Sequence, residues 1–237
     1  MTALRISAKN LGYLALPDFC PRCFWLKMKA ANGLPFQIFP GIFSSIDSYT
    51  KKITNCHFEK SASLPGWFSG FNGLLRPVAV PHHSEFFVVN PETGIRLTGV
   101  PDEIFQRVDE SFFIADYKTA KFTENQDSLM PIYRVQLNTY AYLGNRCGFK
   151  PVTGIGLVYY EPQTDLTMGL VDSVVNQNGF MMPFRGKLLE LELKPEAMIP
   201  PLLREVRRLC DCQKAPIRRD GCEDCERMDD LVGLLAR

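Results

Sequence analysis

Residues 94–122 place three charged side chains inside what otherwise reads as a β-hairpin. The segment is GIRLTGVPDEIFQRVDESFFIADYKTAKF, with two apolar runs on either side of a polar turn. If residues 108–110 form a three-residue loop, Asp102 and Asp116 lie directly opposite one another, about 4.5–5.5 Å apart on one face. Lys118 follows Asp116 by two residues and therefore shares this face. The hairpin thus brings two acids and a lysine together.

Two carboxylates at such a separation repel one another, and burial increases the repulsion. A divalent cation removes the conflict, because carboxylate oxygens are natural ligands of Mg²⁺ and Mn²⁺, which keep waters available for chemistry. A lysine beside such an ion can orient or deprotonate a water, or stabilise developing negative charge. This chemistry is typical of phosphodiester hydrolysis. For the short D-x-K pattern alone the alternative is a surface hairpin with a salt bridge, but the apolar residues leading into both acids favour a site.

The composition indicates one large globular domain whose overall charge produces no strong electrostatic field. The chain has 237 residues, of which 46% are hydrophobic and 22% charged, and its net charge is +1. Any basic surface must therefore be local. No run of eighteen apolar residues occurs, and the opening MTALRISAKN lacks the apolar core of a signal peptide. We expect a cytoplasmic protein without a membrane partner.

The pattern along the chain predicts helices on both sides of a central group of strands. The predicted helices occupy much of residues 1–30, with Ser7 as an N-cap, and residues 41–55, 127–147 and 194–209. The predicted strands cover residues 84–90, 95–107, 111–118, 152–161, 166–175 and 185–193, and residues 61–83 read as loop. Residues 111–161 could form one strand–helix–strand crossover. The fold class is therefore α/β (α+β).

Three motifs resemble those of a known nuclease superfamily. GVPD at 99–102, followed by IADYKT at 114–119, resembles the signature of the PD-(D/E)XK nucleases, and more narrowly the G-x-x-D and D-x-K motifs of RecB-type nuclease domains. The third motif of those domains, Q-x-x-x-Y, is similar to Gln136-Leu-Asn-Thr-Tyr140, whose spacing puts both side chains on one helix face. The resemblance covers about residues 15–228. It implies a restriction-endonuclease-like core, with a central mixed sheet flanked by helices, in a single domain over residues 1–237.

The resemblance also implies a role for each motif residue. Asp102 and Asp116 would bind the divalent ion, and the backbone carbonyl of Tyr117 would be a further ligand. Lys118 would be the catalytic lysine. The side chains of Gln136 and Tyr140 would approach the metal site and the DNA backbone.

One expected ligand is replaced in this sequence. RecB-type domains usually place a histidine on a helix upstream of the hairpin, and GIFSSIDSY has Asp47 there instead. An aspartate oxygen suits Mg²⁺ better than a ring nitrogen does. Asp47 is therefore a third candidate ligand, and an ordinary polar residue of a helix face is an equal alternative.

Six of the eight cysteines lie near the chain ends, in CPRC and CDCQKAPIRRDGCEDC. In a reducing compartment this clustering favours metal over disulfides, although free thiols are the alternative. Two C-x-x-C pairs form a four-thiolate set, Cys20, Cys23, Cys222 and Cys225, suited to zinc or iron–sulfur. A resemblance to the iron–sulfur RecB-like exonucleases associated with CRISPR implies a cluster, with structural Zn²⁺ as the alternative. Their cysteine order gives a second set with Cys212 in place of Cys23, and Cys210 is a further alternate. Such a site would join residues 1–30 and 205–237 into a subdomain.

These observations predict a Mg²⁺- or Mn²⁺-dependent DNA nuclease. By analogy with the family, we expect an exonuclease that acts on single-stranded ends, with protein partners in CRISPR adaptation or DNA repair. The alternative is a non-catalytic DNA-binding or scaffold protein that keeps the fold. A dense basic region over residues 204–219 is a candidate wall of phosphate contacts.

Overall fold

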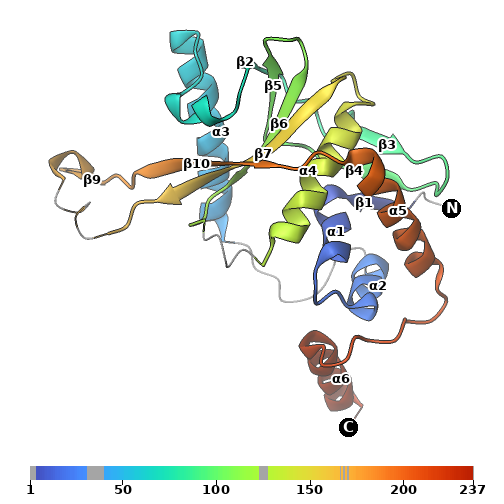
Figure 1. Ribbon diagram of the computed structural model, residues 1–237. Coiled ribbons are helices and arrows are strands. Elements are labelled where there is room, and N and C mark those ends of the chain that lie inside the picture. Colours follow the sequence, from blue (N-terminus) through green and yellow to red (C-terminus); the bar gives the residue numbers. More distant parts are fainter. Residues whose placement is uncertain are drawn as a thin grey trace.

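A five-stranded mixed sheet forms the centre of the molecule (Figure 1). The computed structural model describes residues 4–30, 40–122, 128–165, 167, 169 and 171–236. The strands follow the order β10-β7-β6-β5-β2. In chain order they are β2 (Leu74–Val78), β5 (Glu103–Arg107), β6 (Phe112–Lys118), β7 (Val152–Pro162) and β10 (Phe184–Leu191). Within this five-stranded sheet, as described, β6 and β7 are the one parallel pair, and the helix α4 (Met130–Gly144) connects them as the predicted crossover.

Two smaller sheets complete the strand structure. The first joins β1 (Arg5–Ser7), β4 (Arg96–Thr98) and β3 (Phe87–Val89), with β1 and β4 parallel. The second is a short hairpin of β8 (Val175–Asn176) and β9 (Gly179–Phe180), which projects from the far ends of β7 and β10 (Figure 1).

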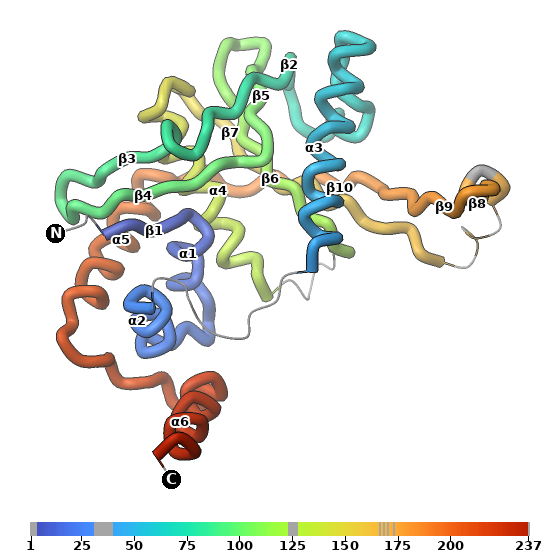
Figure 2. The backbone as a smooth tube through the Cα atoms, turned by 180° about the vertical axis from the view of Figure 1, so that it is seen from behind, coloured from blue at the N-terminus to red at the C-terminus, as the bar shows by residue number. Residues whose placement is uncertain are grey.

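Helices cover both faces of the central sheet. The helix α4 lies on one face, and α3 (Gly41–Ser61) lies on the other, where Figure 2 shows it from behind. On the α4 side, α1 (Ala8–Gly12) and α5 (Pro195–Asp211) pack against α4. The helix α5 is amphipathic, since its buried residues Ile199, Leu203 and Val206 follow a helical period. Lower in Figure 1, α2 (Pro21–Lys29) lies beside α6 (Glu223–Leu235).

The side chains of β6 alternate between two apolar cores. Ile114 belongs to the larger core under α4, whereas Phe113, Ala115 and Tyr117 belong to the smaller core on the α3 side. Because alternate residues of a strand point to opposite faces, Asp116 faces the α4 side together with Ile114. A charged residue is thereby buried between a strand and a helix.

The predicted fold class is confirmed, and most of the predicted elements are present. Ser7 caps α1 by accepting a hydrogen bond from the Asn10 amide. Within residues 61–83, which read mostly as loop, the strand β2 was missed, and it pairs with β5 despite containing Pro77. As an edge strand, β2 can tolerate a residue that donates no amide hydrogen bond. The strand predicted over 166–175 is wrong in its described part, where residues 172–174 form a 3-10 turn.

Among the described elements, β1, β9 and the last helix, α6, were also missed at the sequence level. Within the described residues, no helix combines the length and the apolar character that crossing a bilayer requires.

The glycine of the GVPD motif has a packing role that can be tested. A Cβ on Gly99 would lie 2.7 Å from Cε1 of Tyr140 and 3.0 Å from Cβ of Ala8. We expect Gly99→Ala to lower the free energy of unfolding by about 1–3 kcal/mol, because the Tyr140 ring must move. Guanidinium denaturation measures this change. The control Gly41→Ala has open space around the new methyl group and should leave stability unchanged or slightly raised. Equal midpoints for Gly99→Ala and the wild type would contradict the packing argument.

Candidate active site and cysteine cluster

The turn between β5 and β6 sets the register that opposes the two aspartates. Glu110 adopts φ 65°, and Asp109 Oδ1 accepts hydrogen bonds from the Ser111 amide and hydroxyl at 3.1 and 2.6 Å. The Arg107 amide donates to the Ser111 carbonyl at 2.8 Å, so residues 108–110 form the predicted three-residue loop. The register then pairs Glu103 with Ala115. One step further, Asp102 lies opposite Asp116, as the sequence predicts.

Asp116 is a buried acid with few partners. It is 3% exposed, and its Oδ2 forms a close ion pair with Lys118 Nζ. Its Oδ1 receives a long contact of 3.4 Å from Gln136 Nε2. Burial raises the pKa of Asp116 to about 7, and repulsion from Asp102 adds to this, while Lys118 opposes it. A buried carboxylate that faces a second acid and has one charged partner fits the ligand role.

The second acid is held by α3 and by β6. Asp102 Oδ2 accepts a hydrogen bond of 2.7 Å from the Tyr117 amide, which places the Tyr117 backbone at the site. Its Oδ1 lies 2.8 Å from the ammonium of Lys51. The same ammonium lies 2.9 Å from Asp47 Oδ2. The structure therefore brings Asp47 to the edge of the site, through a lysine that the sequence analysis did not consider.

Gln136 and Tyr140 lie side by side on α4, and both are buried. Gln136 Nε2 donates to Tyr140 Oη at 2.7 Å. Burial raises the pKa of Tyr140 well above its usual value, and the nearby charge of Asp116 raises it further. The third motif therefore contacts the acid pair as a neutral hydrogen-bonding dyad.

Glu103 is a buried acid that sequence reasoning missed. It points to the opposite face of the sheet, where its Oε2 accepts hydrogen bonds of 3.3 Å from Tyr117 Oη and Asn55 Nδ2. Burial raises the pKa of Glu103 to about 7, although these hydrogen bonds lower it. The only sequence signal for Glu103 was an acid directly after Asp102 at the start of an apolar strand. Its contacts join α3 to the hairpin.

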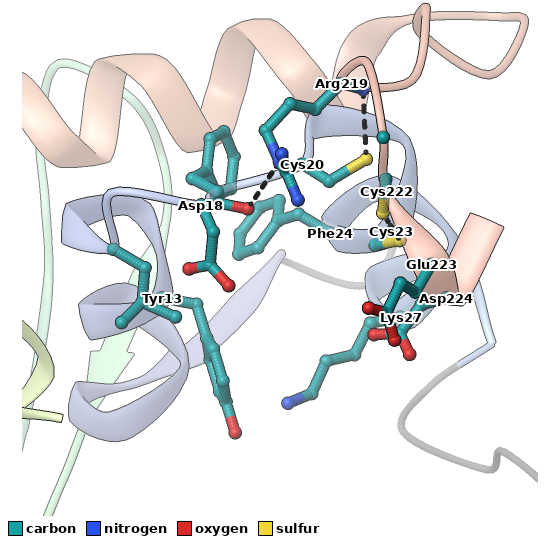
Figure 3. Close-up of a pocket in the computed structure, with 13 residues that line it drawn as sticks. Tyr13, Asp18, Cys20, Cys23, Phe24, Lys27, Arg219, Cys222, Glu223 and Asp224 are labelled. Carbon is teal, nitrogen blue, oxygen red and sulfur yellow. Dashed lines mark hydrogen bonds between the residues drawn. The ribbon is translucent and has the colours of Figure 1, made fainter. Parts of the chain in front are cut away.

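The four cysteines of the two C-x-x-C pairs form a second site, far from the acids along the chain. The sulfurs of Cys20, Cys23, Cys222 and Cys225 all lie within 4.8 Å of one another. Figure 3 shows Cys20, Cys23 and Cys222 beside a cavity of about 580 Å³ between α2 and the start of α6. The Arg219 amide donates to Cys20 Sγ at 3.4 Å, and the Arg219 guanidinium donates to the Asp18 carbonyl at 3.0 Å. These contacts hold the two chain ends together.

The thiols of this cluster have divergent proton affinities. Burial opposes ionisation of Cys20, but hydrogen bonds from the Arg219 and Cys23 amides and from neighbouring thiols lower its pKa to about 6. Burial raises the pKa of Cys225 to about 11 and also raises that of Cys23. One sulfur is therefore ready to bind a metal, while others must lose protons first.

The remaining cysteines lie outside the cluster. Cys212 Sγ contacts the Arg208 carbonyl, and Cys147 Sγ contacts the Phe87 carbonyl. Within the described ranges, the four-sulfur group includes neither Cys210 nor Cys212. The geometry therefore favours the set with Cys23 over the set with Cys212.

Several arginines of the basic region over residues 204–219 form exposed ion pairs with acids. Arg204, Arg207 and Arg208 pair with Glu92, Asp211 and Glu205 at 3.1, 2.7 and 2.6 Å. Arg218 pairs with Asp229 at 3.4 Å. Local acids thus neutralise much of the charge that could have met phosphates.

Comparisons with known proteins identify the family of the chain. A family model described as the PD-(D/E)XK nuclease superfamily matches residues 55–229, which include all three motifs. The solved structure described as "Crystal structure of SSO0001" is similar, with a TM-score of 0.40 and 11% identity, over 91% of this chain and 80% of that chain. No protein with a curated function matches the chain. Because the family model spans well over half of the sequence, the chain belongs to the PD-(D/E)XK nuclease superfamily.

Proposed function

We propose that the protein is a divalent-metal-dependent deoxyribonuclease whose active site is formed by Asp102, Asp116 and Lys118. The observation that carries the proposal is the buried carboxylate of Asp116, which faces Asp102 across the hairpin with Lys118 as its charged partner. Two acids in this arrangement need positive charge to remain ionised together. A Mg²⁺ or Mn²⁺ ion supplies that charge and would also polarise the phosphate and activate a water.

The donor set fits such an ion. The Asp116 carboxylate is buried, and Asp102 approaches it from the opposing strand. Asp47 is the proposed third carboxylate ligand, and the Tyr117 carbonyl is the proposed backbone ligand. Both residues are connected to Asp102. The ammonium of Lys51 links Asp47 to Asp102, and the Tyr117 amide donates a hydrogen bond to Asp102. All of these donors are oxygens, which is the ligand type that Mg²⁺ and Mn²⁺ prefer.

The chain's own groups have distinct parts in hydrolysis. In the reaction, a water oxygen forms a bond to phosphorus, the bond from phosphorus to the leaving sugar oxygen breaks, and that oxygen gains a proton. Lys118 stabilises the negative charge that develops on the phosphate or positions the attacking water. Its ammonium is held by Asp116 and by the Tyr133 ring, whose centroid is 4.4 Å away. Gln136 and Tyr140 orient Asp116 and approach the DNA backbone.

The resemblance to RecB-type domains supports a finer proposal. We take single-stranded DNA ends as the substrate and exonuclease action as the mode, in the cytoplasm, with partners in CRISPR adaptation or DNA repair. The alternative function is DNA binding without cleavage. The presence of Asp102, Asp116, Lys118, Gln136 and Tyr140 together favours an active enzyme, because a binding protein does not need the full set.

The cysteine cluster is proposed to hold a structural metal. Four tetrahedral bonds of about 2.3 Å, as in zinc–thiolate sites, place the sulfurs about 3.8 Å apart. The observed sulfur separations include 3.3 Å for Cys23–Cys225 and 3.6 Å for Cys20–Cys225 and Cys23–Cys222. This spacing supports a single ion such as Zn²⁺. An iron–sulfur cluster, in which each thiolate binds a separate iron, remains the alternative that the resemblance offers.

Replacement of Lys118 tests the catalytic proposal. We expect Lys118→Ala to lower the rate of cleavage of labelled single-stranded DNA at least about 100-fold, because one charge-stabilising group is lost. The assay compares Mg²⁺, Mn²⁺ and EDTA, and circular dichroism checks the fold. The control Lys121→Ala removes an exposed lysine three residues away and should cleave like the wild type. Near-normal turnover by folded Lys118→Ala would refute the assignment, and wild-type protein that binds DNA without cleaving it would favour the alternative function.

The pKa of Asp116 predicts how metal binding depends on pH. Burial first, and then Asp102, raise this pKa to about 7, so the carboxyl is largely protonated below pH 7. A proton must leave before the ion binds. We expect Mn²⁺ affinity to rise about tenfold per pH unit below pH 7 and to level off above it. Calorimetric titrations at pH 6, 7 and 8 measure this dependence, and Asp116→Asn should abolish it along with most of the affinity. A flat profile in the wild type would contradict the ligand role of Asp116.

Two cysteine variants test the structural metal site. Cys23 and Cys212 have similar partial burial, but only Cys23 belongs to the four-sulfur cluster. We expect Cys23→Ser to lose the metal and Cys212→Ser to retain it, as measured by elemental analysis of anaerobically purified protein. One zinc per chain would support the single ion, whereas several irons with broad absorption would support the cluster. Unchanged metal content in Cys23→Ser would exclude this ligand set.

A further inference from the structure

Lys51 occupies a central position between two proposed metal ligands. Its ammonium lies 2.8 Å from Asp102 Oδ1 and 2.9 Å from Asp47 Oδ2. The other oxygen of Asp102 already accepts the Tyr117 amide hydrogen at 2.7 Å. Both oxygens of Asp102 are thus engaged, and one of them is engaged by a positive charge.

A divalent ion and this ammonium would need the same place. An ion bound to Asp102 lies about 2.0–2.2 Å from its oxygen, so it would lie very close to an ammonium 2.8 Å from that oxygen. Two positive charges at such a separation repel strongly in a partly buried site. Each cation would therefore weaken the binding of the other to Asp102 Oδ1.

The helix that carries Lys51 is fixed, so only its side chain is free to move away. Asp47, Lys51 and Asn55 are spaced at four-residue intervals and form one face of α3. Asn55 Nδ2 donates to Glu103 Oε2 at 3.3 Å, which ties the next turn of α3 to β5. On the buried side of the helix, Thr54 contacts both Tyr117 and Tyr160. These contacts prevent α3 from moving as a whole.

A cavity beside Lys51 offers a destination for the displaced ammonium. Its volume is about 530 Å³, and Lys51, Asn55 and Asp102 line one part of it. Further along α3 the carboxylate of Glu59 lines the same cavity. The side chain of Lys51 can therefore leave Asp102 without entering the apolar core, and it can approach another acid.

We propose that Lys51 is a built-in competitor of the divalent ion. Before the ion arrives, Lys51 holds Asp47 and Asp102 together and offsets one of their two negative charges. When the ion binds, Lys51 must leave Asp102. Lys51 is therefore a positioning residue that sets the affinity of the site for its metal. This inference rests on the proposed function, because it takes Asp102 as a metal ligand.

Mn²⁺ titration of the DNA-free protein, followed by electron paramagnetic resonance, tests the competition. Lys51→Met removes the charge and keeps a side chain of similar shape, and Lys51→Gln is a second neutral variant. Lys52→Met is the matched control, because it removes the same charge from the neighbouring exposed position of α3. We expect both Lys51 variants to bind Mn²⁺ about fivefold or more tightly than Lys52→Met. Lys51→Arg keeps the charge and should bind like the wild type.

Two different results would overturn the inference, and they differ in meaning. If Asp102→Asn removes Mn²⁺ binding but the neutral Lys51 variants bind no more tightly than Lys52→Met, the metal site stands and Lys51 is not a competitor. If Asp102→Asn binds Mn²⁺ like the wild type, Asp102 is not a ligand, and the proposed metal site falls together with the competition. Circular dichroism confirms that each variant is folded.

Discussion

The opposition of Asp102 and Asp116 across the β5–β6 hairpin is the constraint on which the active site depends. Asp116 is 3% exposed and its pKa is raised to about 7, first by burial and then by Asp102, so the pair is electrostatically unstable by itself. Lys118 compensates one acid and Lys51 the other. A buried charge persists only when it is paired. Under the proposed function, a metal ion would take over from Lys51 at Asp102, whereas Lys118 would stay beside Asp116.

The fold supports this balance from both faces of the sheet. On one face, α4 places Gln136 and Tyr140 beside Asp116, and the absence of a side chain at Gly99 lets the Tyr140 ring approach the motif strand. On the other face, Glu103 holds Tyr117 and Asn55, which ties α3 to the hairpin. The acids are therefore positioned from both faces of the sheet, by α4 on one face and by α3 on the other. Buried hydrogen bonds of this kind fix the orientation of the side chains that carry them.

Local patterns in the sequence predicted the hairpin site well, because strand pairing and helix periodicity are local geometry. The three-residue turn fixed the opposition of the two acids, and the four-residue spacing fixed Gln136 beside Tyr140. Lys51 and Glu103 could not be recognised in this way, since their roles depend on how α3 docks against the sheet, which is a tertiary contact. The same reason explains β2, whose Pro77 reads as loop until β5 provides a partner. The pairing of Arg204 with Glu92 could not be read from the sequence either, because Glu92 lies in a distant turn.

The cysteine cluster influences the active site only through the packing of helices. The cluster joins α2 to the start of α6. The helix α2 contacts α5, and α5 packs against α4. Trp25 Nε1 and Lys29 Nζ on α2 each donate to a carbonyl at the end of α5, at 3.1 Å to Cys212 and 3.1 Å to Cys210. The helix α4 carries Gln136 and Tyr140, so a chain of contacts runs from the sulfurs to the acids. The hairpin, however, is held by its own turn and by strand pairing, which do not involve the cluster. Loss of the structural metal should therefore release α6 and the end of α5 first, while the opposition of Asp102 and Asp116 remains.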